Sequence, residues 1–100
     1  MNNVDAVCAR ALAEAKVYGM GHAMGEVFAI AHVSTQTVDK GWVFFYNTEE
    51  FLKTGNPLSA LAGNGPLLVL LNGQVKVLPT SLPWQEAVQN IDASTDGRAV

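Results

Sequence analysis

The sequence of 100 residues predicts one α+β domain: an antiparallel sheet of about four strands covered by an N-terminal helix, with short helices between strands 2 and 3 and at the C-terminus. Helical spacing of apolar residues in the N-terminal part is followed by short apolar runs, and the links between paired runs are too short for a parallel crossover. A composition of 49% apolar and 15% charged residues is typical of a chain that buries a core. We therefore expect a single domain over residues 1–91 and a flexible tail over residues 92–100, which show no packing pattern.

The charge and cysteine content exclude several classes of protein. The formal charge is −3 and the six basic residues are scattered, which gives no basic face of the kind that nucleic-acid binders carry. Cys8 is the single cysteine, so no internal disulfide can form. The N-terminal stretch lacks the basic region of a signal peptide, and no apolar run is long enough to cross a membrane. We expect a cytoplasmic protein that binds neither nucleic acid nor membranes.

Apolar residues at helical spacing predict the N-terminal helix. The expected buried face consists of Val4, Val7, Cys8, Ala11, Leu12, Ala15 and Tyr18, and the charged residues off that face are Arg10, Glu14 and Lys16. Asn2 or Asn3 can cap the start of the helix, and Gly19 or Gly21 can end it. Cys8 is expected to be a small buried hydrophobic residue.

Two strands are predicted after this helix. The first is Glu26–Val33, both faces of which are largely apolar, and the second is Trp42–Tyr46, which is rich in aromatic and β-branched residues. Asp39-Lys40-Gly41 is the expected reversal between them. So short a connection favours antiparallel pairing of the two strands.

Two short helices are predicted in the second half of the chain. The first has Asn47 or Thr48 as its cap, Glu49 and Glu50 in its first turn, where the helix dipole favours anions, and Gly55 at its end. The second begins at a proline, a residue suited to the first helical turn. Its expected apolar face consists of Trp84, Val88 and Ile91.

A β-hairpin is predicted between these two helices. Leu58–Ala62 is expected to make one further helical turn, and Gly63–Pro66 then turns the chain into the third strand. Asn72-Gly73 is a type I′ turn dipeptide between apolar runs. It should therefore pair Leu67–Leu71 with Gln74–Leu78.

The sequence contains no catalytic or metal-binding motif. His22 and His32 have no Cys, Asp or Glu at ligand spacing. Gly63-Asn64-Gly65 precedes a proline and a strand, whereas a phosphate-binding loop precedes a helix and carries a Lys-Ser/Thr pair. Glu49 and Glu50 diverge by about 100° on a helix, so they do not readily face a common substrate. We predict no catalytic residue, no cofactor and no metal; a Ser-His-Asp arrangement stays open without a fold.

A partner-binding surface is the remaining functional prediction. Tyr and Trp are enriched at interface hot spots, and an acidic-aromatic combination suits a basic enzyme cleft. We therefore expect Tyr46, Glu49, Glu50 and Trp84 to contact a protein partner. An exposed edge strand, either Glu26–Val33 or Gln74–Leu78, could also pair with a second copy and give a homodimer.

Two motifs, taken together, resemble those of a known family. The first is Gly41–Asn47, read GWVFFYN, and the second is Ala60–Pro66, read ALAGNGP, which an aliphatic strand follows. With Phe51-Leu52 and the segment Leu82–Ile91, they resemble the YrhB-like family, small bacterial proteins grouped with the immunity proteins of polymorphic-toxin systems. The family's Thr-Gly style turn is Asn72-Gly73 here.

This resemblance implies a cytoplasmic α+β protein that binds and neutralises a toxin enzyme without catalysis of its own. It also implies that the shared Gly63–Pro66 elbow holds the fold. Two alternatives stay open. A homo-oligomeric, chaperone-like binder of unfolded proteins is favoured by the high apolar fraction and sparse charge. A small ligand-binding or enzymatic domain would require a concave pocket with convergent polar groups.

Overall fold

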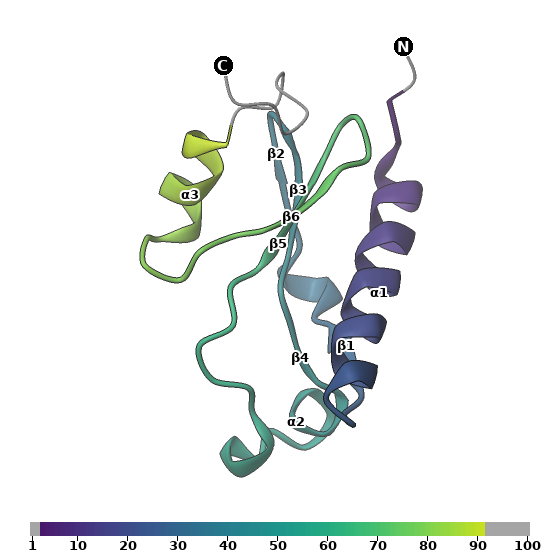
Figure 1. Cartoon of the computed structure of the whole chain (residues 1–100), viewed down its shortest axis with the longest axis vertical. Helices are drawn as coiled ribbons and strands as arrows, with labels where there is room; N and C mark the ends of the chain where they lie inside the picture. The colour runs from purple at the N-terminus through teal and green to yellow at the C-terminus, as the bar shows by residue number, and fades with distance from the viewer. Residues whose placement is uncertain (1–2, 92–100) are drawn as a thin grey trace.

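The computed structural model describes residues 3–91, which fold into helices on both sides of an antiparallel sheet (Figure 1). The elements are α1 (Ala6–Ala23), β1 (Phe28–Ile30), the 3₁₀ turn η1 (His32–Ser34), β2 (Gln36–Val38), β3 (Gly41–Phe44), β4 (Tyr46–Thr48), α2 (Glu49–Thr54), the 3₁₀ turn η2 (Pro57–Ser59), β5 (Leu67–Leu70), β6 (Val75–Val77) and α3 (Trp84–Asn90). The predicted α+β class is confirmed. The tail predicted for residues 92–100 lies outside the described residues.

The strands form two antiparallel sheets instead of the one expected. The larger has the order β2-β3-β5-β6, and the smaller pairs β1 with β4. The predicted strand Trp42–Tyr46 is divided between them, because β3 pairs with β2 and β5 while β4 pairs with β1. Phe45 lies at the change of partner, where its carbonyl accepts a hydrogen bond from Ala31 N–H at 2.7 Å. One continuous stretch of chain therefore links both sheets.

The first predicted strand is shorter than expected. Only Phe28–Ile30 is extended and paired, and the chain then bends into η1, where Ser34 N–H donates to the carbonyl of Ala31 at 2.9 Å. Because this turn directs Val33 into solvent, that side chain is 99% exposed. The expected antiparallel pairing of the first and second predicted strands is found only at the end of the second, where Ile30 of β1 pairs with Tyr46 of β4. The expected reversal at residues 39–41 joins β2 to β3.

The central strand β5 is buried on both faces. Leu67 and Val69 pack against α1, whereas Leu68 and Leu70 pack against α3. All four side chains are 1% exposed or less. Figure 1 shows α1 and α3 on opposite sides of the sheet. This double burial explains why the strand reads as an unbroken apolar run and not as an alternating one.

The hairpin from β5 to β6 forms as predicted, but with a different turn. Leu70 N–H donates to Gln74 C=O at 2.8 Å, and Gly73 N–H donates to Leu70 C=O at 2.8 Å. Three residues, not two, therefore form the loop, and Gly73 closes it at φ 91°. A glycine at this position is typical of three-residue hairpins. Leu67 consequently pairs with Val77, one residue out of the expected register.

The buried face of α1 is not the predicted one. Ala9, Ala13 and Val17 are 1% exposed or less and face the sheet. At Gly21 an added Cβ would lie 2.8 Å from the carbonyl oxygen of Glu26. The absence of a side chain at Gly21 therefore lets the helix lie close to the segment that follows it. Asp5, not an asparagine, caps the start by accepting the Cys8 N–H at 2.9 Å.

Most of the stripe expected to be buried instead faces solvent, although Val4 at its start packs against the core. Val7 is 77% exposed and Tyr18 is 66% exposed, and Cys8 is exposed as well. The prediction was wrong because α1 carries apolar residues nearly all round. Two opposite faces satisfy the helical spacing, and the tertiary fold selects the one with the smaller side chains.

The C-terminal helix α3 docks on the other face of the sheet, as its predicted apolar positions require. Val88 is buried, and Trp84 packs edge-to-face on Phe45 with ring centroids 5.9 Å apart. Lys40 Nζ donates to the carbonyls of Val88 at 2.7 Å and Gln89 at 3.1 Å, and also to that of Ile91. A lysine from the β2–β3 turn thus supplies partners to the last carbonyls of α3.

Candidate partner-binding site

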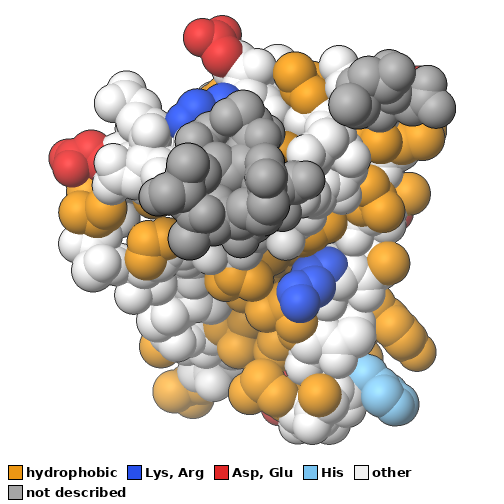
Figure 2. All heavy atoms as spheres, turned by 45° about the horizontal axis from the view of Figure 1, so that its top comes forward, with side chains coloured by type: hydrophobic (Ala, Val, Ile, Leu, Met, Phe, Trp, Pro, Cys, Tyr) orange, Lys and Arg blue, Asp and Glu red, His pale blue; other side chains and the backbone are white. Residues whose placement is uncertain are grey.

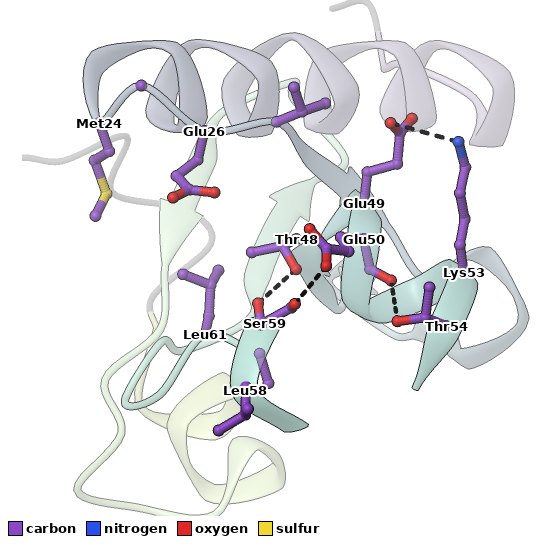
Figure 3. Close-up of a pocket in the computed structure, with 13 residues that line it drawn as sticks. Met24, Glu26, Thr48, Glu49, Glu50, Lys53, Thr54, Leu58, Ser59 and Leu61 are labelled. Atoms are coloured by element: carbon purple, nitrogen blue, oxygen red, sulfur yellow. Dashed lines mark hydrogen bonds and ion pairs between the residues drawn. The ribbon is translucent and has the colours of Figure 1, made fainter. Parts of the chain in front are cut away.

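An open hollow of about 770 Å³ lies between the end of α1 and the segment formed by α2 and η2 (Figure 3). We call this hollow the acidic groove. The side chains that define its chemistry are Met24, Glu26, Val27, Glu49, Glu50, Lys53 and Leu58. They come from three segments that are distant in the sequence, so only the folded chain brings them together.

The charge of the acidic groove is negative. Glu26, Glu49 and Glu50 face one cation, Lys53, among the residues that line it, which gives a formal charge of −2. Glu49 Oε1 lies 3.6 Å from Lys53 Nζ, and both side chains are about half exposed or more. Glu50 Oε2 accepts a hydrogen bond from Ser59 Oγ at 2.9 Å. The carboxylates therefore stay accessible while two of them are held in place.

Exposed apolar side chains line the same groove. Leu58 is 93% exposed, Met24 is 66% exposed and Val27 is 56% exposed. Apolar contacts beside carboxylates suit a partner segment that combines basic and apolar residues.

The wall formed by α2 and η2 is held by Thr48 and Asn47. Thr48 Oγ1 accepts the Phe51 N–H at 3.0 Å, which caps α2, and donates to the Ser59 carbonyl at 2.7 Å. Asn47 Oδ1 accepts the N–H groups of Thr48 at 2.8 Å and Leu61 at 2.7 Å. These bonds join the two ends of the segment to β4, so the groove has a fixed wall. The predicted helix cap at Thr48 is confirmed.

The Gly63–Pro66 elbow is part of the same framework. Asn64 Nδ2 donates to the Tyr46 carbonyl at 3.1 Å. A Cβ added to Gly65 would lie 1.9 Å from the carbonyl oxygen of Leu78, so the backbone passes directly against another strand end. The elbow acts as architecture, in line with the expectation from the sequence.

The four predicted contact residues lie in different places. Glu49 and Glu50 are exposed in the acidic groove. Tyr46 is 6% exposed, with its ring centroid 6.1 Å from that of Phe28, and burial raises the pKa of its hydroxyl. Trp84 is half-buried on α3 and lines a separate hollow of about 260 Å³. The structure therefore brings together the two glutamates but not the two aromatic residues.

Two groove residues, Glu26 and Leu58, were not predicted from the sequence. The sequence places Glu26 at the start of the predicted first strand and Leu58 in the predicted helical turn Leu58–Ala62. Neither prediction indicated that these residues lie on a contact surface. A leucine directly after Asn56-Pro57, a helix-stopping pair, was the available signal that it sits at an exposed turn.

The two histidines lie apart from the groove. His22 stacks on Tyr18 with ring centroids 6.2 Å apart, and His32 Nε2 lies 3.3 Å from Glu14 Oε2. Over residues 3–91, no group of three or more His, Cys, Asp or Glu side chains could hold a metal ion. Within the same residues, none of the helices has the length and apolar character needed to cross a membrane.

Comparisons with known proteins identify the family. The model of the family described as immunity protein 35 matches residues 9–91. "Uncharacterized protein YrhB" of Escherichia coli (strain K12) is 35% identical over 54 residues, which cover 53% of this chain and 57% of that protein. The match thus spans little more than half of the relative's own length, and no solved structure matches significantly. Both findings confirm the resemblance carried by the two motifs, and the chain belongs to the immunity protein 35 family.

Proposed function

We propose that this protein binds and neutralises a cognate toxin enzyme in the bacterial cytoplasm, as a stoichiometric partner and not as a catalyst. The observation that supports this proposal is the match to the immunity protein 35 family over residues 9–91. Immunity proteins act by occupying their toxin. Binding of this kind requires a complementary surface rather than catalytic groups.

The acidic groove is our proposed contact surface. Its formal charge of −2 favours a basic partner segment, and charge complementarity of this kind raises the association rate. Leu58, exposed at the rim, offers an apolar contact beside Glu49 and Glu50. Trp84 is proposed as a second contact at the far side of the molecule, whereas the buried Tyr46 would act by holding β4 under the groove.

Co-expression with each neighbouring gene product that is toxic when expressed alone tests the proposal. We expect the wild-type chain to restore growth and to be isolated in a defined complex with the toxin. The double variant E49K/E50K reverses two exposed charges of the groove and is expected to weaken binding by at least tenfold, mainly through slower association at low salt.

Glu86→Lys is the matched control, because Glu86 is an exposed glutamate in the first turn of α3 and lies outside the groove. This control is expected to protect as well as wild type. Failure of the wild-type chain to bind any such gene product would contradict the function. Equal protection by E49K/E50K and wild type would contradict only the choice of surface.

A chaperone-like binder of unfolded chains is the second candidate. The observation that favours it is the exposure of Val33 at 99% and Leu58 at 93%. Such a protein would suppress the thermal aggregation of several unrelated enzymes at similar molar ratios. A toxin-specific protein would leave that aggregation unchanged.

A further inference from the structure

Exposed apolar side chains are spread over the molecule, so exposure alone does not identify a contact residue. Figure 2 shows hydrophobic side chains at many places on the visible face. Two residues are almost fully exposed, Leu58 at 93% and Val33 at 99%, and each lies in a 3₁₀ turn, η2 and η1 respectively. The two residues differ in how their turns are held and in the charge around them.

The turn that carries Leu58 is held on both sides by side chains. Asn56 Oδ1 accepts the Leu58 N–H at 3.0 Å, and Pro57 between them has a fixed backbone angle. After the leucine, the carbonyl of Ser59 accepts a hydrogen bond from Thr48 Oγ1 at 2.7 Å. Leu58 therefore projects into solvent from a turn whose backbone is already positioned.

The turn that carries Val33 has weaker support. None of the described side chains caps the start of η1. Gln36 Nε2 donates to the Ser34 carbonyl at 3.4 Å, and His32 Nε2 lies 3.3 Å from Glu14 Oε2, both at exposed positions where such contacts stabilise little. Val33 also lines neither of the two hollows described above. It is therefore a matched control for Leu58.

The surroundings of Leu58 are acidic. Ser59 Oγ donates to Glu50 Oε2 at 2.9 Å, which holds this carboxylate beside the residue that follows the leucine (Figure 3). The lining of the acidic groove, to which Leu58 belongs, has a formal charge of −2. A partner surface that complements this arrangement has an apolar pocket with basic side chains at its border.

We propose that Leu58 is the anchor of the contact with the toxin, and that its side chain inserts into an apolar pocket of the toxin with a basic border. This inference rests on the proposed function, because it takes the toxin as the partner. A turn that is already held in position loses little conformational entropy on binding, so more of the free energy gained by burying the leucine contributes to affinity.

Substitutions at position 58 test the anchor, with the neighbouring gene product that the wild-type chain neutralises as the probe. Leu58→Ala is expected to weaken binding about thirtyfold, mainly through faster dissociation. Leu58→Met keeps the apolar volume and should bind within about threefold of wild type. Val33→Ala is the control and should bind as wild type does. Circular dichroism should be unchanged in all three, because both positions are exposed.

A double-mutant cycle tests whether the turn positions the anchor. Asn56→Ala removes the hydrogen bond to the Leu58 N–H and leaves the leucine in place. We expect this variant to bind about fivefold more weakly than wild type. In the Leu58→Ala background the same change should cause no further loss, because Asn56 acts through the leucine. An equal loss in both backgrounds would show that Asn56 does not position Leu58.

Photocross-linking gives a direct readout of the contact. The photoreactive residue p-benzoylphenylalanine at position 58 should cross-link to the toxin, and the same residue at position 33 should not.

The outcomes separate the anchor from the function. A wild-type chain that neutralises none of the neighbouring toxic products contradicts both. If the wild type binds, the function stands, and the anchor is overturned by any of three results: wild-type affinity in Leu58→Ala, an equal loss in Val33→Ala, or a loss in Leu58→Ala that lies in association and varies with salt, as expected for E49K/E50K.

Discussion

Gly65 lies so close to the end of β6 that no side chain fits at its position. An added Cβ would meet the carbonyl oxygen of Leu78 at 1.9 Å. We expect Gly65→Ala to lower the free energy of unfolding by about 1–3 kcal/mol, because the backbone must move apart. Urea denaturation measures this loss. Gly19→Ala is the control, since a Cβ there meets nothing within 4 Å, and it should be neutral or slightly stabilising.

The carboxylate of Asp5 makes the stability of the start of α1 depend on pH. The N–H of Cys8 donates to its carboxylate, and this hydrogen bond lowers the pKa of Asp5 below its usual range. A lowered pKa in the folded state means that the stabilisation is present above the unfolded pKa and disappears as the pH falls through the folded value. Asp5→Asn keeps a capping oxygen that does not titrate.

We therefore expect the stability difference between wild type and Asp5→Asn to shrink as the pH falls below about 4. Urea unfolding midpoints measured for both proteins between neutral and acid pH provide the check. A difference that stays constant over this range would show that the carboxylate charge does not stabilise the helix.

Among the elements, α3 has the carbonyls at its C-terminal end hydrogen-bonded by a single lysine from another part of the chain. Lys40 Nζ donates to three carbonyls at the end of this helix. Lys40→Met keeps most of the aliphatic stem but leaves those carbonyls without their charged donor, at a cost of about 2 kcal/mol. Hydrogen exchange should accelerate at the amides of α3 and stay slow at those of β5. Lys53→Met, an exposed lysine on α2, should leave the exchange of α3 unchanged.

The elements that local chemistry determines were predictable from the sequence. Thr48 caps α2 and Gly55 ends it, because both roles depend on residues within one turn. The hairpin was found from Asn72-Gly73, although the turn contains one residue more than expected. The face of α1 was not predictable, since Ala9 and Ala11 fit the helical spacing of opposite faces equally well and only packing against the sheet distinguishes them.

The candidate site was predictable in the same limited way. Glu49 and Glu50 were recognised because a helix start exposes its first turn. Glu26 lies near these two glutamates because of the path that the chain takes after α1, and no local sequence pattern predicts that path. Trp84 was grouped with them on residue type alone, yet it lies on the other side of the sheet.

At the scale of the whole molecule, β5 unites two clusters of buried side chains. Leu68 faces α3 while its neighbours Leu67 and Val69 face α1. Leu68→Ala is expected to lower the free energy of unfolding by about 2–5 kcal/mol and to loosen both layers in one transition. Near-ultraviolet and far-ultraviolet circular dichroism should give coincident thermal curves. Leu58→Ala removes an equal side chain that is 93% exposed and should leave the melting temperature nearly unchanged.

The wall of the acidic groove has a consequence for how its specificity can change. Hydrogen bonds of Asn47 and Thr48 fix the backbone of that wall. The side chains of Glu49, Glu50 and Leu58 are exposed on it, and their own contacts are limited to an exposed ion pair of Glu49 with Lys53 and an exposed hydrogen bond of Glu50 with Ser59. In the contact surface proposed above, exchanging those three residues would alter what the groove recognises at a smaller cost to the fold than a change at Asn47 or Thr48. Under the proposed function, a lineage that meets new toxins would vary this small set first, and a designer could randomise the same positions while leaving the wall's hydrogen bonds in place.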